Sequence, residues 1–347
     1  MTDEPASLTR GSRPTIRDVA RVAKVSIGTV SAVINKGGTS VAPHTREHVL
    51  RCITELGFEP NNAARSLKRQ RISSIGFIVP DLKNSFFADV AEGIQSALDN
   101  VDFLLVLCMT WASKEREEYY AQVLRTQRLD GVIYLSGTGM PCAPLLNLAK
   151  HGTVIFVDEC LPGLEVPFIS SQNLKGARSL ARHVIESGHT RLAILSGPRG
   201  LWTSEQRQAG YREACAGAGI DPDEVQVIEG DYTEQSGENA AEQVLAMDIN
   251  ERPSAVLCAN DLMAIGFIRR CNERGLRVPA DISVTGFDDI AGAERLDPPL
   301  TTVKQPGRAM GQAAAQLLLN RIGAGTEPPA QLDFPTQLCI RSSVAKL

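Results

Sequence analysis

The sequence predicts a small all-α head with a helix-turn-helix, followed by an α/β body of two lobes with parallel sheets flanked by helices. Apolar residues recur at helical spacing near the N-terminus, and short apolar runs alternate with helical stretches from residue 73 onward. Residues 1–71 hold 12 Lys and Arg against 6 Asp and Glu, a net charge of +6, whereas the rest hold 24 against 34, a net charge of −10. We therefore expect a basic head on an acidic body.

The composition also bounds the class of protein. At 347 residues with 43% hydrophobic residues, the chain is long enough for two or three domains. The eight cysteines lack zinc-ligand spacing, so we expect reduced, mostly buried thiols and neither a metal nor another cofactor. No secretory signal or membrane-spanning run is visible, which predicts a cytoplasmic protein without a membrane partner. Residues 1–12 are polar and aperiodic, and we expect a disordered arm there.

The first predicted helix of the head, residues 13–60, begins at Ile16, where apolar residues follow helical spacing up to Ala23. Thr15 is the expected N-cap, and Asp18 completes a pair that resembles a capping box.

A second stripe runs from Ile27 to Ile34, after the break at Lys24-Val25-Ser26. Two short helices joined by a three-residue turn have the spacing of a helix-turn-helix, whose second helix can lie in the major groove of DNA. A third stripe ends at Leu56, with Gly57 as the expected C-cap. Periodicity alone would fit any small helical bundle equally well.

The motifs decide between these interpretations. Residues Thr15 to Ala20, Val25-Ser26, Thr29 to Ser31 and Asn35 resemble the LacI/GalR repressor family, and the match continues through 41–46 and 57–61 over nearly the whole chain. The resemblance implies a homodimer or tetramer that places two heads on a pseudopalindromic double-stranded operator. It implies DNA contacts in the head from Thr15, Lys24, Ser26, Ile27, Gly28, Thr29, Ser31, Ala32, Asn35 and Lys36.

Residues 61–72 resemble the hinge helix of that family. The resemblance implies that Leu67 enters the minor groove at the dyad and that Arg65 and Lys68 lie near the phosphates. Such a wedge kinks DNA by separating a base step, which costs a few kcal/mol and is offset by better backbone contact. On composition alone, the same segment would be a solvated basic linker.

The second helix departs from the family pattern. Ile27, Gly28 and Ala32 stand where relatives place hydrogen-bonding side chains, and Lys24 stands where a turn glycine is usual. We expect Ile27 and Ala32 to contact thymine methyl groups, with DNA shape and the Leu67 wedge carrying much of the specificity.

The body begins at residue 73 with apolar runs that each predict a buried parallel strand. The runs are 75–80, 103–108, 131–135, 154–157, 192–195, 225–228, 255–258 and 283–285, with helices predicted over 87–98, 115–127 and 309–321. The body resembles a periplasmic sugar-binding protein. We expect one lobe from residues 73–172 and 305–333, and the other from 173–304 and 334–347.

Ligands of open α/β sheets bind beyond the carboxyl ends of the strands. Carried over from the family, the residues expected to bind a small-molecule effector there are Asn84, Phe86, Phe87, Asp158, Trp202, Thr203, Arg207, Tyr232, Asn260 and Asp288. Carboxylate, amide and guanidinium groups pair with sugar hydroxyls, and aromatic rings cover the apolar faces of a sugar.

Structural alternatives exist for single members of this set. Phe87 could be core, Arg207 and Asp288 could form only an ion pair, and Trp202 could lie at the surface. We expect Asp261 to cap the helix that follows it.

The sequence predicts an allosterically controlled transcriptional regulator, and a repressor is the favoured form. A carbohydrate is the favoured effector, with a nucleobase or nucleoside as the alternative. Leu201 and Glu159 stand where some relatives place basic ligand-binding groups, which argues against a strongly anionic effector. A sugar-binding transport protein is disfavoured by the basic head, and an enzyme by the absence of a P-loop, a metal cluster or a Ser/His/Asp grouping, so we expect no catalytic residue.

Overall fold

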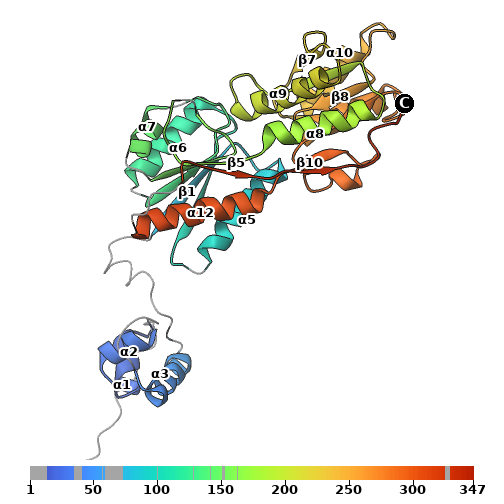
Figure 1. The fold of residues 1–347 in the computed structure, drawn as a ribbon. Helices are drawn as coiled ribbons and strands as arrows, with labels where there is room; N and C mark the ends of the chain where they lie inside the picture. The colour runs from blue at the N-terminus through green and yellow to red at the C-terminus, as the bar shows by residue number, and fades with distance from the viewer. Residues whose placement is uncertain are drawn as a thin grey trace, which may run out of the picture. The chain divides into compact units, whose positions relative to one another are not determined.

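The computed structural model forms two compact units, residues 1–72 and residues 73–347 (Figure 1). It describes residues 14–34, 41–56, 58, 73–99, 101–127, 129–140, 142–150, 153–161, 163–324 and 329–347. Several expectations therefore lie outside the described residues, namely the arm at 1–12, the C-cap Gly57, the hinge segment 61–72, and the DNA contacts of Asn35, Lys36, Arg65, Leu67 and Lys68.

The first unit contains the three predicted helices, α1 (Ile16–Val22), α2 (Ile27–Ile34) and α3 (Pro43–Leu56). They pack around one small apolar cluster that includes Val19, Val30 and Val49, each fully buried. The capping pair is also confirmed, because the Asp18 carboxylate accepts hydrogen bonds from the backbone N–H and the hydroxyl of Thr15 at 2.9 and 2.6 Å. The predicted head is thus a closed three-helix unit.

The turn between α1 and α2 contains Lys24 in the left-handed region, at φ 53°. Glycine adopts this conformation without steric cost, whereas a residue with a Cβ pays roughly 1 kcal/mol or more for it. The lysine at the usual glycine position therefore strains the turn.

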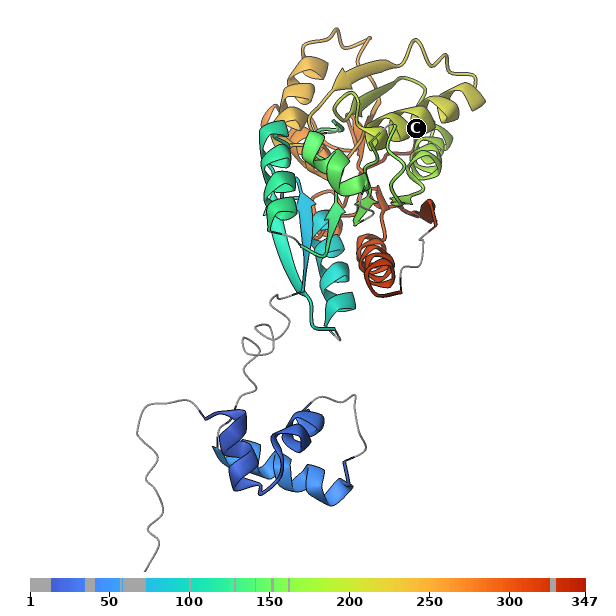
Figure 2. The ribbon, with the colours of Figure 1, turned by 90° about the vertical axis from the view of Figure 1, so that its left-hand side faces the viewer.

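The second unit begins with a parallel six-stranded sheet in the order β11-β5-β4-β3-β1-β2. Its strands are β1 (Ser74–Val79), β2 (Leu104–Met109), β3 (Gly131–Tyr134), β4 (Val154–Val157), β5 (Phe168–Ser171) and β11 (Gln331–Phe334). Helices α5 (Ser85–Leu98) and α12 (Gly307–Ala324) pack side by side on one face, and α6 (Lys114–Thr126) and α7 (Ala143–Lys150) on the other (Figures 1 and 2). We call this sheet with its helices the first lobe.

A parallel four-stranded sheet in the order β7-β6-β8-β9 forms the second lobe. Its strands are β6 (Leu192–Ser196), β7 (Gln226–Glu229), β8 (Ala255–Cys258) and β9 (Ser283–Thr285). Helices α8 (Asn173–Glu186) and α9 (Trp202–Gly217) cover one face, and α10 (Glu234–Leu245) and α11 (Asp261–Glu273) cover the other. A short 3-10 helix (Ala293–Arg295) precedes β10 (Thr302–Lys304), which pairs antiparallel with β12 (Gln337–Cys339).

The prediction that every apolar run is a buried strand is wrong for the edge strands β2 and β7, and Val227 of β7 is 37% exposed. Leu104, Val106 and Leu107 are 50%, 37% and 39% exposed. The physical reason is that β2 is the edge strand of its sheet, so one of its sides has no neighbouring strand. Leu105 and Cys108 of this apolar run still pack on the core, so the run is only partly exposed.

All eight cysteines are free thiols, and six of them are buried, as predicted. Within the described part of the chain, no helix is long and apolar enough to cross a membrane.

Candidate functional site

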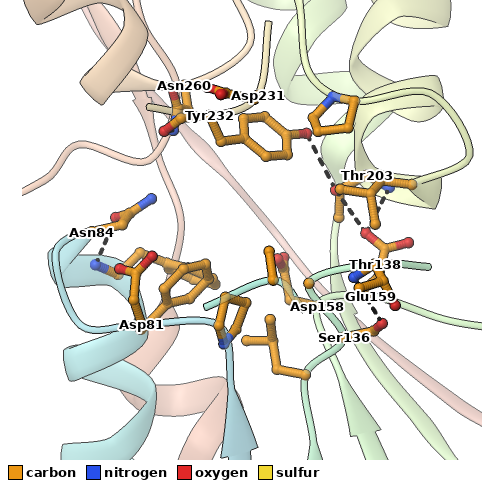
Figure 3. Close-up of a pocket in the computed structure, with 18 of the residues that line it drawn as sticks. Asp81, Asn84, Ser136, Thr138, Asp158, Glu159, Thr203, Asp231, Tyr232 and Asn260 are labelled. Carbon is orange, nitrogen blue, oxygen red and sulfur yellow. Dashed lines mark hydrogen bonds between the residues drawn. The ribbon is translucent and has the colours of Figure 1, made fainter. Parts of the chain in front are cut away.

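A cavity of about 630 Å³ lies between the two lobes, at the carboxyl ends of their strands. Figure 3 shows part of its lining. Nine of the ten predicted effector residues line it, namely Asn84, Phe86, Phe87, Asp158, Thr203, Arg207, Tyr232, Asn260 and Asp288.

Arg207 projects from α9 and is only 3% exposed. Its Nε donates to Asn173 Oδ1 at 2.8 Å, and its Nη1 donates to the carbonyl of Ala259 at 2.6 Å and lies 3.4 Å from Asp288 Oδ1. The guanidinium carbon lies 4.0 Å from the centre of the Phe287 ring, at cation–π distance. Arg207 is therefore fixed in place by the second lobe itself.

Asp288 joins the two lobes. Its Oδ2 accepts from the Asn84 amide at 2.6 Å, and its Oδ1 accepts from the Gln305 amide at 2.8 Å. Burial raises the pKa of Asp288, although the neighbouring Arg207 opposes that shift. Asn84 also caps α5, because its side chain accepts from the backbone N–H of Phe86. One carboxylate therefore connects the loop after β1 with the loop after β9.

Asp158 follows β4 and is 6% exposed. Its Oδ1 is buried and has no hydrogen-bond partner among the described residues. Its backbone is left-handed, at φ 65°, and burial is the main cause that raises the pKa of this carboxyl to about 7. A buried acceptor without a donor costs about 1–3 kcal/mol, so this oxygen is suited to a donor group on a ligand.

Glu159 is buried beside Asp158 and reaches the start of α9 (Figure 3). It accepts hydrogen bonds from the backbone N–H groups of Trp202 and Thr203 and from the Thr203 hydroxyl, at 2.5, 3.2 and 2.8 Å. Burial and the adjacent Asp158 raise the pKa of Glu159 to about 8.

The prediction that Asp261 caps α11 is wrong. Asn260 is the cap, because its Oδ1 accepts from the Met263 backbone N–H at 2.9 Å, and its amide donates to the Tyr232 carbonyl at 3.0 Å. Asp261 is fully buried and accepts instead from the Ile290 backbone N–H and the Thr302 hydroxyl. Neighbouring polar residues both suit a cap, and the sequence does not reveal the distant donors that fix Asp261.

Trp202 is the predicted effector residue that does not line the cavity. Its indole packs edge-on against Phe168 of β5, with ring centroids 5.1 Å apart, within an apolar cluster of the first lobe. The two phenylalanines after β1 do line the cavity, although Phe86 is only 2% exposed.

Sequence reasoning missed a buried network that supports the cavity wall. Glu117 of α6 accepts from the hydroxyls of Tyr134 and Thr138 and from the backbone N–H of Gly137, each at 2.7 Å. Gly137 and Thr138 lie on the loop after β3. Its position after a predicted strand was the available signal, whereas Glu117, about 20 residues earlier, gave none.

Two further lining residues were missed on the loop after β2. Trp111 is 49% exposed, and it and Ala112 both have left-handed backbones, at φ 56° and 51°.

The predicted DNA contacts that the structure describes lie on the accessible surface of the first unit. Lys24, Ser26, Ile27 and Gly28 are exposed, as is Thr15, while Thr29, Ser31 and Ala32 are partly exposed. The Ser26 hydroxyl accepts from the Thr29 backbone N–H at 3.0 Å and so caps α2. Ile27 exposes 47% of its surface, which is unusual for an isoleucine that only supports a core.

Comparisons with known proteins agree with this architecture. The family of bacterial regulatory proteins of the lacI type matches residues 15–61, and the periplasmic binding protein-like domain matches residues 181–344. The transcriptional repressor PurR of Vibrio campbellii is 36% identical over 340 residues, which covers 96% of this chain and 99% of that protein. The transcriptional regulator CelR of Thermobifida fusca is 37% identical over 345 residues, with the same shares covered.

Two solved structures are similar over the same extent. A complex of the regulator CelR with cellobiose is 34% identical, with a TM-score of 0.69 over 95% of this chain and 100% of that chain. A lac repressor dimer bound to operator and the anti-inducer ONPF is 30% identical, with a TM-score of 0.80 over 96% and 100%. The chain belongs to the lacI family of bacterial regulatory proteins and is a DNA-binding transcriptional regulator with a small-molecule effector domain.

Proposed function

We propose that this regulator is a repressor whose effector is a neutral carbohydrate bound in the cavity between the lobes. The observation that carries the proposal is the buried Asp158 Oδ1, an acceptor that lacks a donor among the described residues. Five lining residues are acidic, namely Asp81, Asp158, Glu159, Asp231 and Asp288, against the basic Lys83, Lys114 and Arg207. Because Arg207 is already paired within the protein, acceptors prevail, and a ligand rich in hydroxyl donors suits them.

Isothermal titration with glucose, ribose, cellobiose and lactose tests this proposal. We expect at least one of these sugars to bind, and Asp158→Ala to weaken that binding by tenfold or more, since a charge-assisted hydrogen bond contributes about 1.5–3 kcal/mol.

A nucleobase effector is the second candidate, because the relative PurR is a similarly close match and Phe86, Phe87 and Tyr232 offer rings for stacking. In this chain the N-cap residue of α9 is Leu201, whose apolar side chain offers a base no hydrogen bond. The same titration includes hypoxanthine and guanine. Binding of either base, with none of the sugars bound, would replace the carbohydrate proposal.

We further propose that the chain acts in the cytoplasm as a homodimer on a pseudopalindromic operator, with α2 of each head in the major groove. The basic N-terminal region, the exposed face of α2 and the relative solved on its operator support this reading. The exposed apolar edge of β2 offers a surface for contact between two copies. Analytical ultracentrifugation separates a dimer from a tetramer.

A gel shift on promoter DNA at increasing salt tests DNA binding. Counterion release makes the affinity fall steeply, by about 10³ or more between 50 and 200 mM salt for six or more phosphate contacts. Footprinting with Ile27→Ser and Leu67→Ala tests how bases are read, and an unchanged site preference in both variants would contradict the proposed apolar readout.

Control by the effector is allosteric in this proposal. Lobe closure around the ligand changes the dimer arrangement and thereby the DNA affinity. Coupling between two sites is reciprocal, so operator DNA must change effector affinity by the same factor. Calorimetry with and without operator measures that factor, and equal affinities would contradict the coupling.

A further inference from the structure

Three hydrogen-bond donors converge where α9 begins. They are the backbone N–H groups of Trp202 and Thr203 and the hydroxyl of Thr203. The start of a helix carries a partial positive charge and unpaired N–H groups, so it attracts anions such as phosphate or carboxylate. In this chain the convergence faces the cavity between the lobes, since Thr203 and Leu201 both line it.

All three donors are already occupied by one side chain of the other lobe. The Glu159 carboxylate, on the loop after β4, accepts from them at 2.5, 3.2 and 2.8 Å. Glu159 is only 2% exposed, so this contact between the two lobes is buried inside the molecule. Leu201 holds the N-cap position and supplies no capping hydrogen bond, so the distant glutamate takes over that role.

The surroundings of Glu159 add further negative charge. Asp158 lies next to it and is also buried. The Tyr232 hydroxyl lies 3.4 Å from the Thr203 hydroxyl (Figure 3). A ligand phosphate that approached α9 would meet two carboxylates and no unoccupied donor among these groups. Such a ligand would have to displace Glu159 and break the three hydrogen bonds that Glu159 accepts from the start of α9.

We infer that Glu159 is a specificity-determining residue that occupies the anion-binding end of α9, so that the cavity takes neutral ligands and rejects phosphorylated or carboxylated ones. This inference deepens the proposed carbohydrate function and rests on it for the nature of the natural ligand. The exclusion of anions by Glu159 can itself be measured without any sugar.

Inorganic phosphate is the probe, and Glu159→Ala is the variant, in the full-length protein at pH 8.5. This pH lies above the pKa of about 7 for Asp158 and of about 8 for Glu159, so both carboxyl groups are mainly ionised. Removal of the carboxylate frees the two N–H groups and the Thr203 hydroxyl. We expect phosphate affinity, measured by calorimetry and by the shift in melting temperature, to rise by about tenfold or more over the unaltered chain, since charge-assisted hydrogen bonds become available to it. Glu159→Ser is the second variant, in case alanine disturbs folding.

Two control variants test whether a gain in phosphate affinity comes from the freed donors at the start of α9 or only from the loss of a negative charge. Asp81→Ala removes one negative charge from the same cavity, away from α9, and Glu159→Gln removes the charge but leaves an amide oxygen against the N–H groups. We expect neither to gain phosphate affinity to the extent of Glu159→Ala. An equal gain in Asp81→Ala, or no gain in either Glu159→Ala or Glu159→Ser, overturns the inference.

The outcome is distinguishable from failure of the proposed function. If no sugar binds the unaltered chain but Glu159→Ala gains phosphate, the carbohydrate proposal fails while the exclusion of anions stands. If sugars bind but neither Glu159→Ala nor Glu159→Ser gains phosphate affinity, the inference on Glu159 is overturned while the carbohydrate proposal stands.

Discussion

The two recognition surfaces of this chain use different physical interactions. The exposed start of α2 presents Ile27 and Gly28, which offer apolar surface and backbone to a partner. The cavity between the lobes presents Arg207 and Asp288, which are buried and paired with neighbours, and Asp158, which is buried and whose Oδ1 has no hydrogen-bond partner among the described residues. Shape can therefore be read by the first surface, whereas the second requires matched donors and acceptors.

This difference has an energetic consequence. Exposed apolar residues contribute little to folding, so their replacement changes binding more than stability. Buried charged residues contribute to both, because removal of one partner leaves the other without compensation.

Arg207→Ala should cost about 3–5 kcal/mol of unfolding free energy. It removes the cation paired with the buried Asp288, which keeps its amide bonds from Asn84 and Gln305, and it leaves the Asn173 amide oxygen without the Arg207 donor. The matched control is Arg212→Ala on the same helix, where the ion pair with Asp223 is largely exposed. That pair should contribute about 0–1 kcal/mol. Urea unfolding of both variants measures the difference, and equal losses would show that the buried pair is not a structural element.

Stability should fall as the pH rises from about 5 to about 8.5. Burial raises the pKa of Asp158 to about 7 and that of Glu159 to about 8, above the unfolded values of about 3.9 and 4.3. The folded chain therefore binds more protons than the unfolded chain in this window, and each rise in pH favours unfolding.

In Asp158→Asn the side chain at position 158 cannot ionise. The unfolding free energy of this variant, relative to that of the unaltered chain, should therefore rise by a few kcal/mol between pH 5 and pH 8.5. Thermal melts at pH 5 and pH 8.5 measure this. A constant difference between variant and unaltered chain across that range would show that Asp158 does not titrate there.

Val30→Ala should destabilise the first unit by about 1–3 kcal/mol, since Val30 is fully buried in its only described apolar cluster. Ile27→Ala is the matched control on the same helix, and its 47% exposure predicts a much smaller loss. For operator affinity we expect Ile27→Ala to reduce binding although the head remains folded. Circular dichroism and gel shifts separate the two effects, and equal destabilisation would mean that Ile27 supports the fold.

Lys24→Gly should stabilise the head by up to about 1 kcal/mol, because glycine relieves the left-handed backbone at φ 53°. Lys24→Ala loses the same charge but keeps the strain, so it should show no such gain. Thermal melts of Lys24→Gly and Lys24→Ala, each compared with the unaltered chain, measure the change in stability of the head. A gain in both variants would assign it to the removed charge instead.

Local pattern predicted a large part of the fold. The bounds of α2 follow from its apolar stripe, and β4 covers the same residues as its apolar run, because both elements bury a regular face. β2 shows the limit of this reasoning. Its three leucines and one valine would equally suit a core strand, and only the strand order of the whole sheet places them at an edge.

The cavity shows a similar limit. Most of its predicted lining residues follow strands, and the ends of parallel strands meet by topology. The contacts that fix these side chains span long separations, such as Asn84 with Asp288 and Glu159 with Thr203. Such pairs depend on how two lobes meet in space, and no local spacing encodes that.

The position of Trp202 has a practical consequence for observing this protein in solution. Trp202 belongs to a helix of the second lobe, yet its indole lies against Phe168 of the first. Separation of the lobes would transfer that ring from apolar surroundings to water and shift its fluorescence emission to longer wavelength. The chain has two tryptophans, and the other, Trp111, is half exposed. With Trp111 replaced by Phe, the emission of a single natural fluorophore would report lobe opening in real time without an attached dye.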